Sequence, residues 1–113
     1  MVTEDDARAL ALELPEATEK SHMGHADFRV RDRIFATLPK PGQMGLRLEQ
    51  GDQAAVVATA PQTFAPAAGA WGRQGWTVVQ LEHADPVELR ELVIDAWRWR
   101  APSRLVAEYD AAR

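Results

Sequence analysis

Arginine side chains gather in one short part of this sequence. Arg29, Arg31 and Arg33 recur at alternate positions within residues 27–38, and Arg47 lies in the next apolar segment. Planar guanidinium groups form paired hydrogen bonds with phosphate oxygens, and a two-stranded ribbon fits a DNA groove. These four arginines are therefore the candidate nucleic-acid-binding residues, with duplex DNA as the expected partner.

The same arginines also have a plainer interpretation. They could form a solvated sheet face that nearby carboxylates partly neutralise, namely Asp27, Asp32 and Glu49. The sequence places no aromatic side chain between the arginines that could stack on the bases of a single strand. Charge alone therefore leaves both interpretations open.

Four tryptophans, Trp71, Trp76, Trp97 and Trp99, supply an alternative site. Trp71, Trp76 and Trp97 could wall a pocket for a small molecule or a protein segment, with Arg100 at its rim to hold an anion. The opposing interpretation is an ordinary core, in which the stem of Arg100 follows apolar surface and its charge faces the helix C-terminus.

A weak metal site is the third alternative. His22, His25 and Asp27 could share an ion, although the flexible Gly24 and the absence of helical spacing weaken the pattern. The acids of the first helix could also hold metal, but most of them lie in the first turn, where they also stabilise the helix end. We expect neither a resident metal nor a cofactor.

No residues form a recognisable catalytic set. Cysteine is absent, and neither Ser21 nor Ser103 lies in a G-x-S-x-G turn. Gly69, Gly72 and Gly75 lack both the order and the lysine of a phosphate-binding loop. The sequence therefore predicts a non-enzymatic binding module.

Length and composition limit the class of protein that could carry these sites. A chain of 113 residues suffices for a single domain, here 1–113. The net charge of −4 conceals a basic middle, because residues 20–50 carry six bases against three acids. No apolar run reaches the length of a membrane span, so we expect a cytoplasmic protein with no membrane partner.

The elements that must position the arginines follow from hydrophobic periodicity. Alternation predicts a hairpin over 27–38 and a third strand over 44–50, whereas 75–81 is an aromatic and β-branched strand. Capping and periodicity predict helices over 3–13, 52–60, 86–100 and 103–109. The order is α-β-β-β-α-β-α-α, an α+β fold with an antiparallel sheet of at least four strands between N- and C-terminal helices. A homodimer that buries a sheet edge stays open.

One register in this hairpin stays unresolved. Phe28 and Val30 face the core if Arg29 and Arg31 face outward. Ile34 and Phe35 are adjacent and both apolar, so one of them must leave the main core.

Several short blocks resemble the MmcQ/YjbR-like family over nearly the whole chain. They are Leu14-Pro15-Glu16, Phe28-Arg29-Val30, Ile34-Phe35-Ala36-Thr37-Leu38, Trp71-Gly72, Gly75-Trp76-Thr77, Ala96-Trp97-Arg98 and Ala101-Pro102. The resemblance implies a CyaY-like or double-wing fold and a DNA-binding role, with no catalytic residues to carry over. Relatives commonly have glycine at the hairpin turn where this chain has Asp32, a residue that tolerates positive φ.

Overall fold

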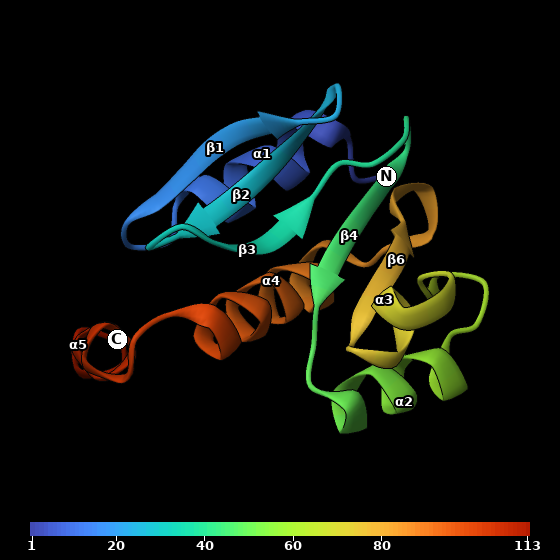
Figure 1. Ribbon diagram of the computed structural model, residues 1–113. Coiled ribbons are helices and arrows are strands. Elements are labelled where there is room, and N and C mark those ends of the chain that lie inside the picture. The colour runs from blue at the N-terminus through green and yellow to red at the C-terminus, as the bar shows by residue number, and fades with distance from the viewer.

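Six strands form one antiparallel sheet in the order β1-β2-β3-β4-β6-β5 (Figure 1). The structure is a computed structural model, which describes residues 1–113 except for the side chain of His22. The strands are β1 (Ala17–His22), β2 (His25–Val30), β3 (Arg33–Thr37), β4 (Gln43–Arg47), β5 (Phe64–Pro66) and β6 (Trp76–Gln80). The helices are α1 (Glu4–Leu12), α2 (Gln50–Thr59), α3 (Gly69–Arg73), the 3-10 turn η1 (Leu81–His83), α4 (Pro86–Arg100) and α5 (Ser103–Ala111). The predicted α+β class is confirmed.

Three elements, and also the short 3-10 turn η1, were not predicted. β1 occupies a segment that the sequence analysis leaves without structure, and β5 and α3 lie in a stretch rich in proline and glycine. The predicted order α-β-β-β-α-β-α-α is therefore incomplete, although every element that it contains is present. β1 pairs with β2 along its whole length, so this strand depends on its partner more than on its own sequence.

The β2–β3 hairpin turns through two residues. Arg31 and Asp32 have φ of +50° and +65°, which makes a type I′ turn between the paired residues Val30 and Arg33. Arg31 therefore lies in the turn and not on the strand face beside Arg29, which corrects the predicted arrangement.

A β-bulge settles the register of β3. Phe28 pairs with Ala36 whereas Arg29 pairs with Ile34, so Phe35 is the extra residue. Phe35 and Ala36 are both fully buried, and Ile34 is only partly buried. The bulge thus lets two adjacent side chains enter the core and leaves Ile34 as the residue that turns away.

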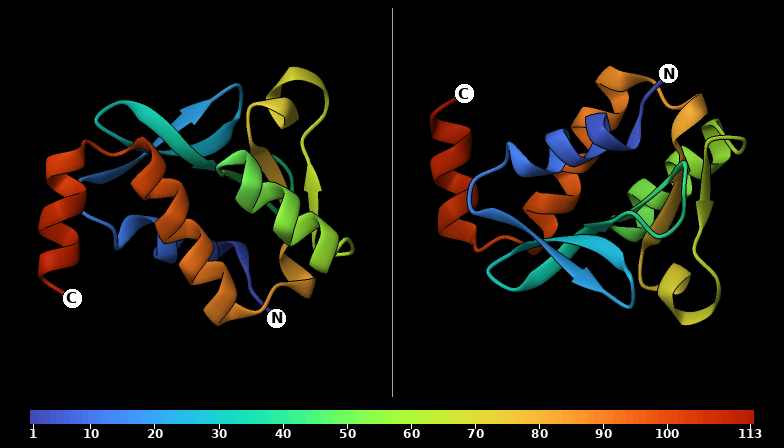
Figure 2. Two further views of the ribbon diagram at one scale, coloured as in Figure 1. Left: turned by 90° about the horizontal axis from the view of Figure 1, so that it is seen from below. Right: turned by 90° about the horizontal axis from the view of Figure 1, so that it is seen from above.

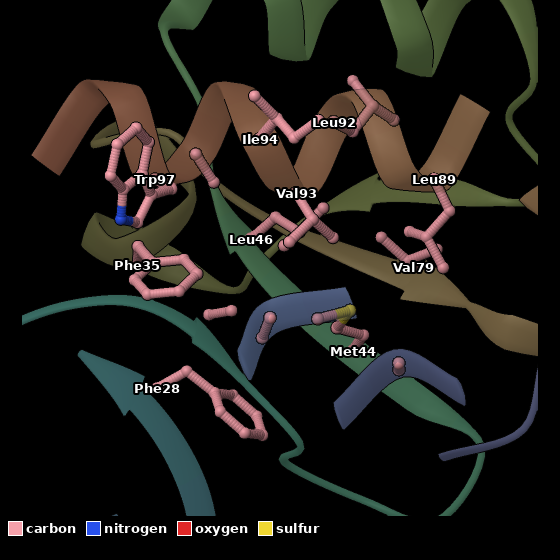
Figure 3. Packing of buried hydrophobic residues seen from close by; sticks show 14 of the residues in the cluster. Phe28, Phe35, Met44, Leu46, Val79, Leu89, Leu92, Val93, Ile94 and Trp97 are labelled. Atoms are coloured by element: carbon pink, nitrogen blue, oxygen red, sulfur yellow. The ribbon is translucent and has the colours of Figure 1, made fainter. Parts of the chain in front are cut away.

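The core lies between the sheet and two helices. Figure 2 shows α1 and α4 next to each other over one face of the sheet. Leu46 of β4 lies against Val93 of α4 and Phe35 of β3 lies against Trp97, whereas Met44 and Phe28 lie farther from α4 in the same cluster (Figure 3). α3 packs on β5 and β6, leaving much of the sheet face opposite α1 and α4 without a helix.

Both helices of the core begin where the sequence predicts. Thr3 and Asp6 form a reciprocal capping box at α1, with both hydrogen bonds at 3.0 Å. Asp85 accepts a hydrogen bond from the Glu88 amide at 2.9 Å and precedes Pro86 at the start of α4. None of the described helices is long and apolar enough to cross a membrane.

The sheet is narrowly joined in its middle. β3 and β4 pair through only two registered positions, Ala36 with Leu46 and Thr37 with Gly45. The first half of β3 therefore diverges from β4, and the last turn of α4 lies there, with Arg100 Nε donating to the Ile34 carbonyl oxygen at 3.1 Å. This divergence positions the site described next.

Candidate functional site

Arg29 is already bound to a carboxylate of its own strand. Its Nε and a terminal nitrogen donate to the two Asp27 carboxylate oxygens at 2.8 and 3.1 Å. Asp27 is fully buried, and this paired hydrogen bond raises the pKa of Arg29. The charge of Arg29 is therefore largely balanced inside the protein.

Arg31 is likewise paired. Its guanidinium makes a two-fold contact with the Glu16 carboxylate just before β1, one bond of which is 3.0 Å long. This hydrogen bonding lowers the pKa of Glu16 and raises that of Arg31. Two of the four predicted nucleic-acid-binding arginines are thus engaged with acids.

The other two belong to a different group. Among the described side chains, four arginines of this region form no ion pair with any carboxylate: Arg33, Arg47, Arg73 and Arg100. Arg33, Arg47 and Arg100 lie near the divergence of β3 and β4. Arg47 and Arg73 line a surface groove of about 510 Å³ together with Leu48, Glu49, Gln50, Gly51, Gln74 and Trp99. We name these eight residues the arginine groove.

Backbone carbonyls fix the walls of the arginine groove. Arg47 Nε donates to the Gln74 carbonyl oxygen at 2.9 Å, and Gln50 Nε2 donates to the Arg73 carbonyl oxygen at 2.6 Å. These bonds hold the β4–α2 connection against the end of α3. Because only Nε of Arg47 is used, its terminal nitrogens keep donor capacity for a ligand.

Arg100 and Arg33 extend the positive charge beside this groove. Partial burial lowers the pKa of Arg100, and the charges of Arg47 and Arg33 lower it further. The guanidinium groups of Arg33 and Arg47 therefore lie close enough to Arg100 to repel it. Glu49 is the single acid on the groove lining, so the site as a whole keeps an excess of positive charge.

The predicted tryptophan cleft is not assembled. Trp97 is fully buried and donates from Nε1 to the Pro15 carbonyl oxygen at 3.0 Å, facing Phe35 in the core (Figure 3). Trp71 is 65% exposed on α3, and its ring meets that of Trp76 edge to face at 6.5 Å between centroids. Trp97 therefore cannot line a surface pocket with the other two.

The glycine-rich segment has a structural explanation. A Cβ on Gly72 or on Gly75 would lie 2.0 Å from a carbonyl oxygen, of Ala67 and of Leu48 respectively. Gly69 has a φ of +64°. Gly72 and Gly75 therefore allow tight backbone approach, and Gly69 allows a backbone conformation that other residues rarely adopt.

The candidate metal ligands divide into two groups. Each acid of α1, and Glu13 directly after it, has a partner: Asp5 pairs with Arg8, Asp6 caps the helix, Glu13 pairs with Arg90 and Glu4 accepts from the Gly42 amide. The proposed His22 ligand lies outside the described side chains. Among the described residues, no three histidine or acidic side chains gather as they would around a metal ion.

Sequence reasoning missed Arg73, and it considered Trp99 only as one of the four tryptophans that could wall a pocket. Arg73 stands alone between glycines and glutamine, and no periodicity links it to Arg47, because their proximity depends on the unpredicted α3. Trp99 carried a usable signal, since it falls off the apolar stripe of α4 and is 48% exposed.

Comparisons with known proteins agree with this fold. The solved structure of a Deinococcus radiodurans protein with a DUF419 domain is similar to it, with a TM-score of 0.77 and 23% sequence identity. The similarity covers 88% of this chain and 78% of that chain. No curated protein matches the sequence significantly. The YjbR family model matches residues 12–99, which is well over half of the sequence, and the chain therefore belongs to the YjbR family.

Proposed function

We propose that this protein is a non-enzymatic binding module that holds nucleic acid, and DNA in the first place, by its phosphates at the arginine groove and the neighbouring Arg33 and Arg100. The observation that supports this most strongly is the gathering of Arg33, Arg47, Arg73 and Arg100 with no described carboxylate paired to any of them. The positive charges of these arginines would repel one another less if they were spread evenly over the surface. A phosphate among these groups would relieve that repulsion and accept several charge-assisted hydrogen bonds.

The proposed phosphate-binding residues differ in part from those predicted from the sequence. Arg29 and Arg31 would have to give up Asp27 and Glu16 before they could bind phosphate. Breaking the pair with Asp27 is especially costly, because it would remove a two-fold, charge-assisted hydrogen bond from a fully buried carboxylate. We therefore assign the phosphate contacts to Arg33, Arg47, Arg73 and Arg100.

The test is DNA binding by fluorescence anisotropy at about 50 and about 200 mM salt, since released counterions make phosphate contacts strongly salt-dependent. The informative variant replaces both groove arginines, Arg47→Gln and Arg73→Gln. Its affinity at low salt should fall roughly tenfold or more, and the slope of log K against log salt should decrease by about 2.

A matched control removes the same charge elsewhere. Arg90→Gln with Arg104→Gln also deletes two guanidinium groups, and both of these arginines are paired with acids, Glu13 and Glu108. This control should bind within about twofold of the native protein. Glu49→Gln, which removes the acid of the groove, should strengthen binding. Equal losses in both double variants, or no binding by the native protein at low salt, would refute the proposal.

A further inference from the structure

A half-exposed indole lies in the same groove as the free guanidinium groups. Trp99 is 48% exposed in the last turn of α4, and it lines the groove with Arg47 and Arg73. Folding normally removes most of so large an apolar surface from water. A flat apolar ring beside two phosphate-binding groups matches the two parts of a nucleotide.

We infer that the arginine groove holds one unpaired nucleotide, whose base stacks on Trp99 while Arg47 and Arg73 hold its phosphates. This inference rests on the proposed function and narrows it to single-stranded nucleic acid. A base within a duplex has both faces covered by its neighbours, so it offers no face to Trp99 until it is unstacked.

The dimensions of the groove agree with this ligand. A volume of about 510 Å³ lies within the range of pockets that hold a small ligand, roughly 300–1,000 Å³. The walls are held in place by the Arg47 and Gln50 bonds to backbone carbonyls, so the site exists before the ligand arrives.

The lining also indicates how the base is read. The Gln50 amide nitrogen already donates to a backbone carbonyl, which leaves Glu49 and Gln74 as the uncharged or acidic side chains of the groove that can meet a base edge. Stacking accepts every base because each has a π face. We therefore expect any base preference to depend on Glu49 and Gln74, since sequence readout needs donors and acceptors.

The experiment compares three probes of equal length: a thymidine single strand, the same strand with abasic sites at every position, and a duplex. The abasic strand keeps the phosphates and removes the rings. The native protein should bind the thymidine strand roughly tenfold more tightly than the abasic strand. Trp99→Ala should abolish that difference while leaving the salt dependence unchanged.

Two further variants make the outcome specific. Trp71→Ala removes the other strongly exposed tryptophan, which does not line the groove, and should behave like the native protein. Trp99→Phe keeps an aromatic face and should restore part of the preference, which a loss of folding would not do.

The possible outcomes test base stacking and phosphate binding separately. Equal binding of thymidine and abasic strands by the native protein, with steep salt dependence, would refute stacking and leave phosphate binding intact. Tighter binding of the duplex than of the single strand would have the same meaning. Failure to bind any of the three probes would refute both proposals.

Discussion

Gly75 fixes the position of one wall of the arginine groove. Its φ of +108° lies in a region that side chains rarely adopt, and a Cβ there would lie 2.0 Å from the Leu48 carbonyl oxygen. The Leu48 amide donates back to the Gly75 carbonyl oxygen at 3.0 Å. This close approach places the end of β4 beside the end of α3.

We predict that Gly75→Ala lowers the free energy of unfolding by about 3 kcal/mol or more, because backbone strain and a backbone clash occur together. Gly24→Ala is the matched control. Gly24 also has a positive φ, of +84°, but no atom lies within 4 Å of its added Cβ, so strain alone should cost about 1 kcal/mol. Urea denaturation followed by circular dichroism measures both. Equal losses would show that the approach to Leu48 matters little.

The sequence identifies the right residue type at the site but only part of the right set. Arg33 and Arg47 could be predicted from alternation in the strands, whereas Arg73 could not. The pairing of Arg29 with Asp27 was accessible, because residues two apart share one face of a strand. The pairing of Arg31 with Glu16 could not be predicted, because it depends on β1, and the sequence does not predict that strand.

At the scale of elements, the turn of the β2–β3 hairpin has a strained backbone. Type I′ turns require positive φ at both central positions, and this chain uses Arg31 and Asp32 where asparagine and glycine are favoured. The Lys20 contact with Asp32 is exposed and 3.4 Å long, so it compensates little for this strain.

Asp32→Gly should therefore stabilise the protein, by about 0.5–1 kcal/mol, because glycine adopts this backbone without strain. Thermal denaturation and urea denaturation should both show the gain. The converse change, Asp32→Val, should destabilise the protein, since a β-branched residue tolerates positive φ least. A loss on introducing glycine would mean that unfolded-state entropy outweighs the turn strain.

The elements that the sequence predicts share strong local signals. The hairpin alternates clearly, and α4 has Asp85 and Pro86 at its start. β1 reads Ala-Thr-Glu-Lys-Ser-His and is mostly polar, so pairing with β2 and the contact of Glu19 with Arg8 of α1 hold it in place. Because β1 depends on such long-range contacts, its own sequence shows no hydrophobic periodicity from which the strand could be predicted. A homodimer through an edge strand, β1 or β5, stays a prediction.

At the scale of the whole molecule, acidic and basic side chains occupy different surroundings along α4. Arg100 near its end is surrounded by other arginines, whereas Asp95 has acids around it. Partial burial raises the pKa of Asp95, and the charges of Asp52, Glu91 and Glu49 raise it further, against the opposing effect of Arg98.

The sign of the effect on stability follows from this shift. A carboxyl with a higher pKa in the folded than in the unfolded chain destabilises the fold when it is charged. The cost is absent below the unfolded value of about 3.9 and grows as the pH rises through the folded value. Asp95→Asn should thus raise the melting temperature at pH 7 by about 2 °C, a small gain because Asp95 is largely solvated.

Melting curves between pH 3 and pH 8 test this prediction. The variant and the native protein should coincide near pH 3, where Asp95 is protonated in both the folded and the unfolded chain, and separate as the pH rises. A constant difference at every pH would indicate that asparagine acts through packing or helix propensity and not through charge.

Trp97 and Trp99, two residues apart on α4, lie in opposite surroundings, one in the dry core and the other half in water. An indole in an apolar environment fluoresces at shorter wavelength than an indole in water, so one helical turn contains two optical probes. The blue component follows the integrity of the fold, and the red component includes Trp99 on the wall of the groove. We therefore expect unfolding to change the blue part of the emission spectrum and groove occupancy to change the red part, which Trp99 shares with the exposed Trp71.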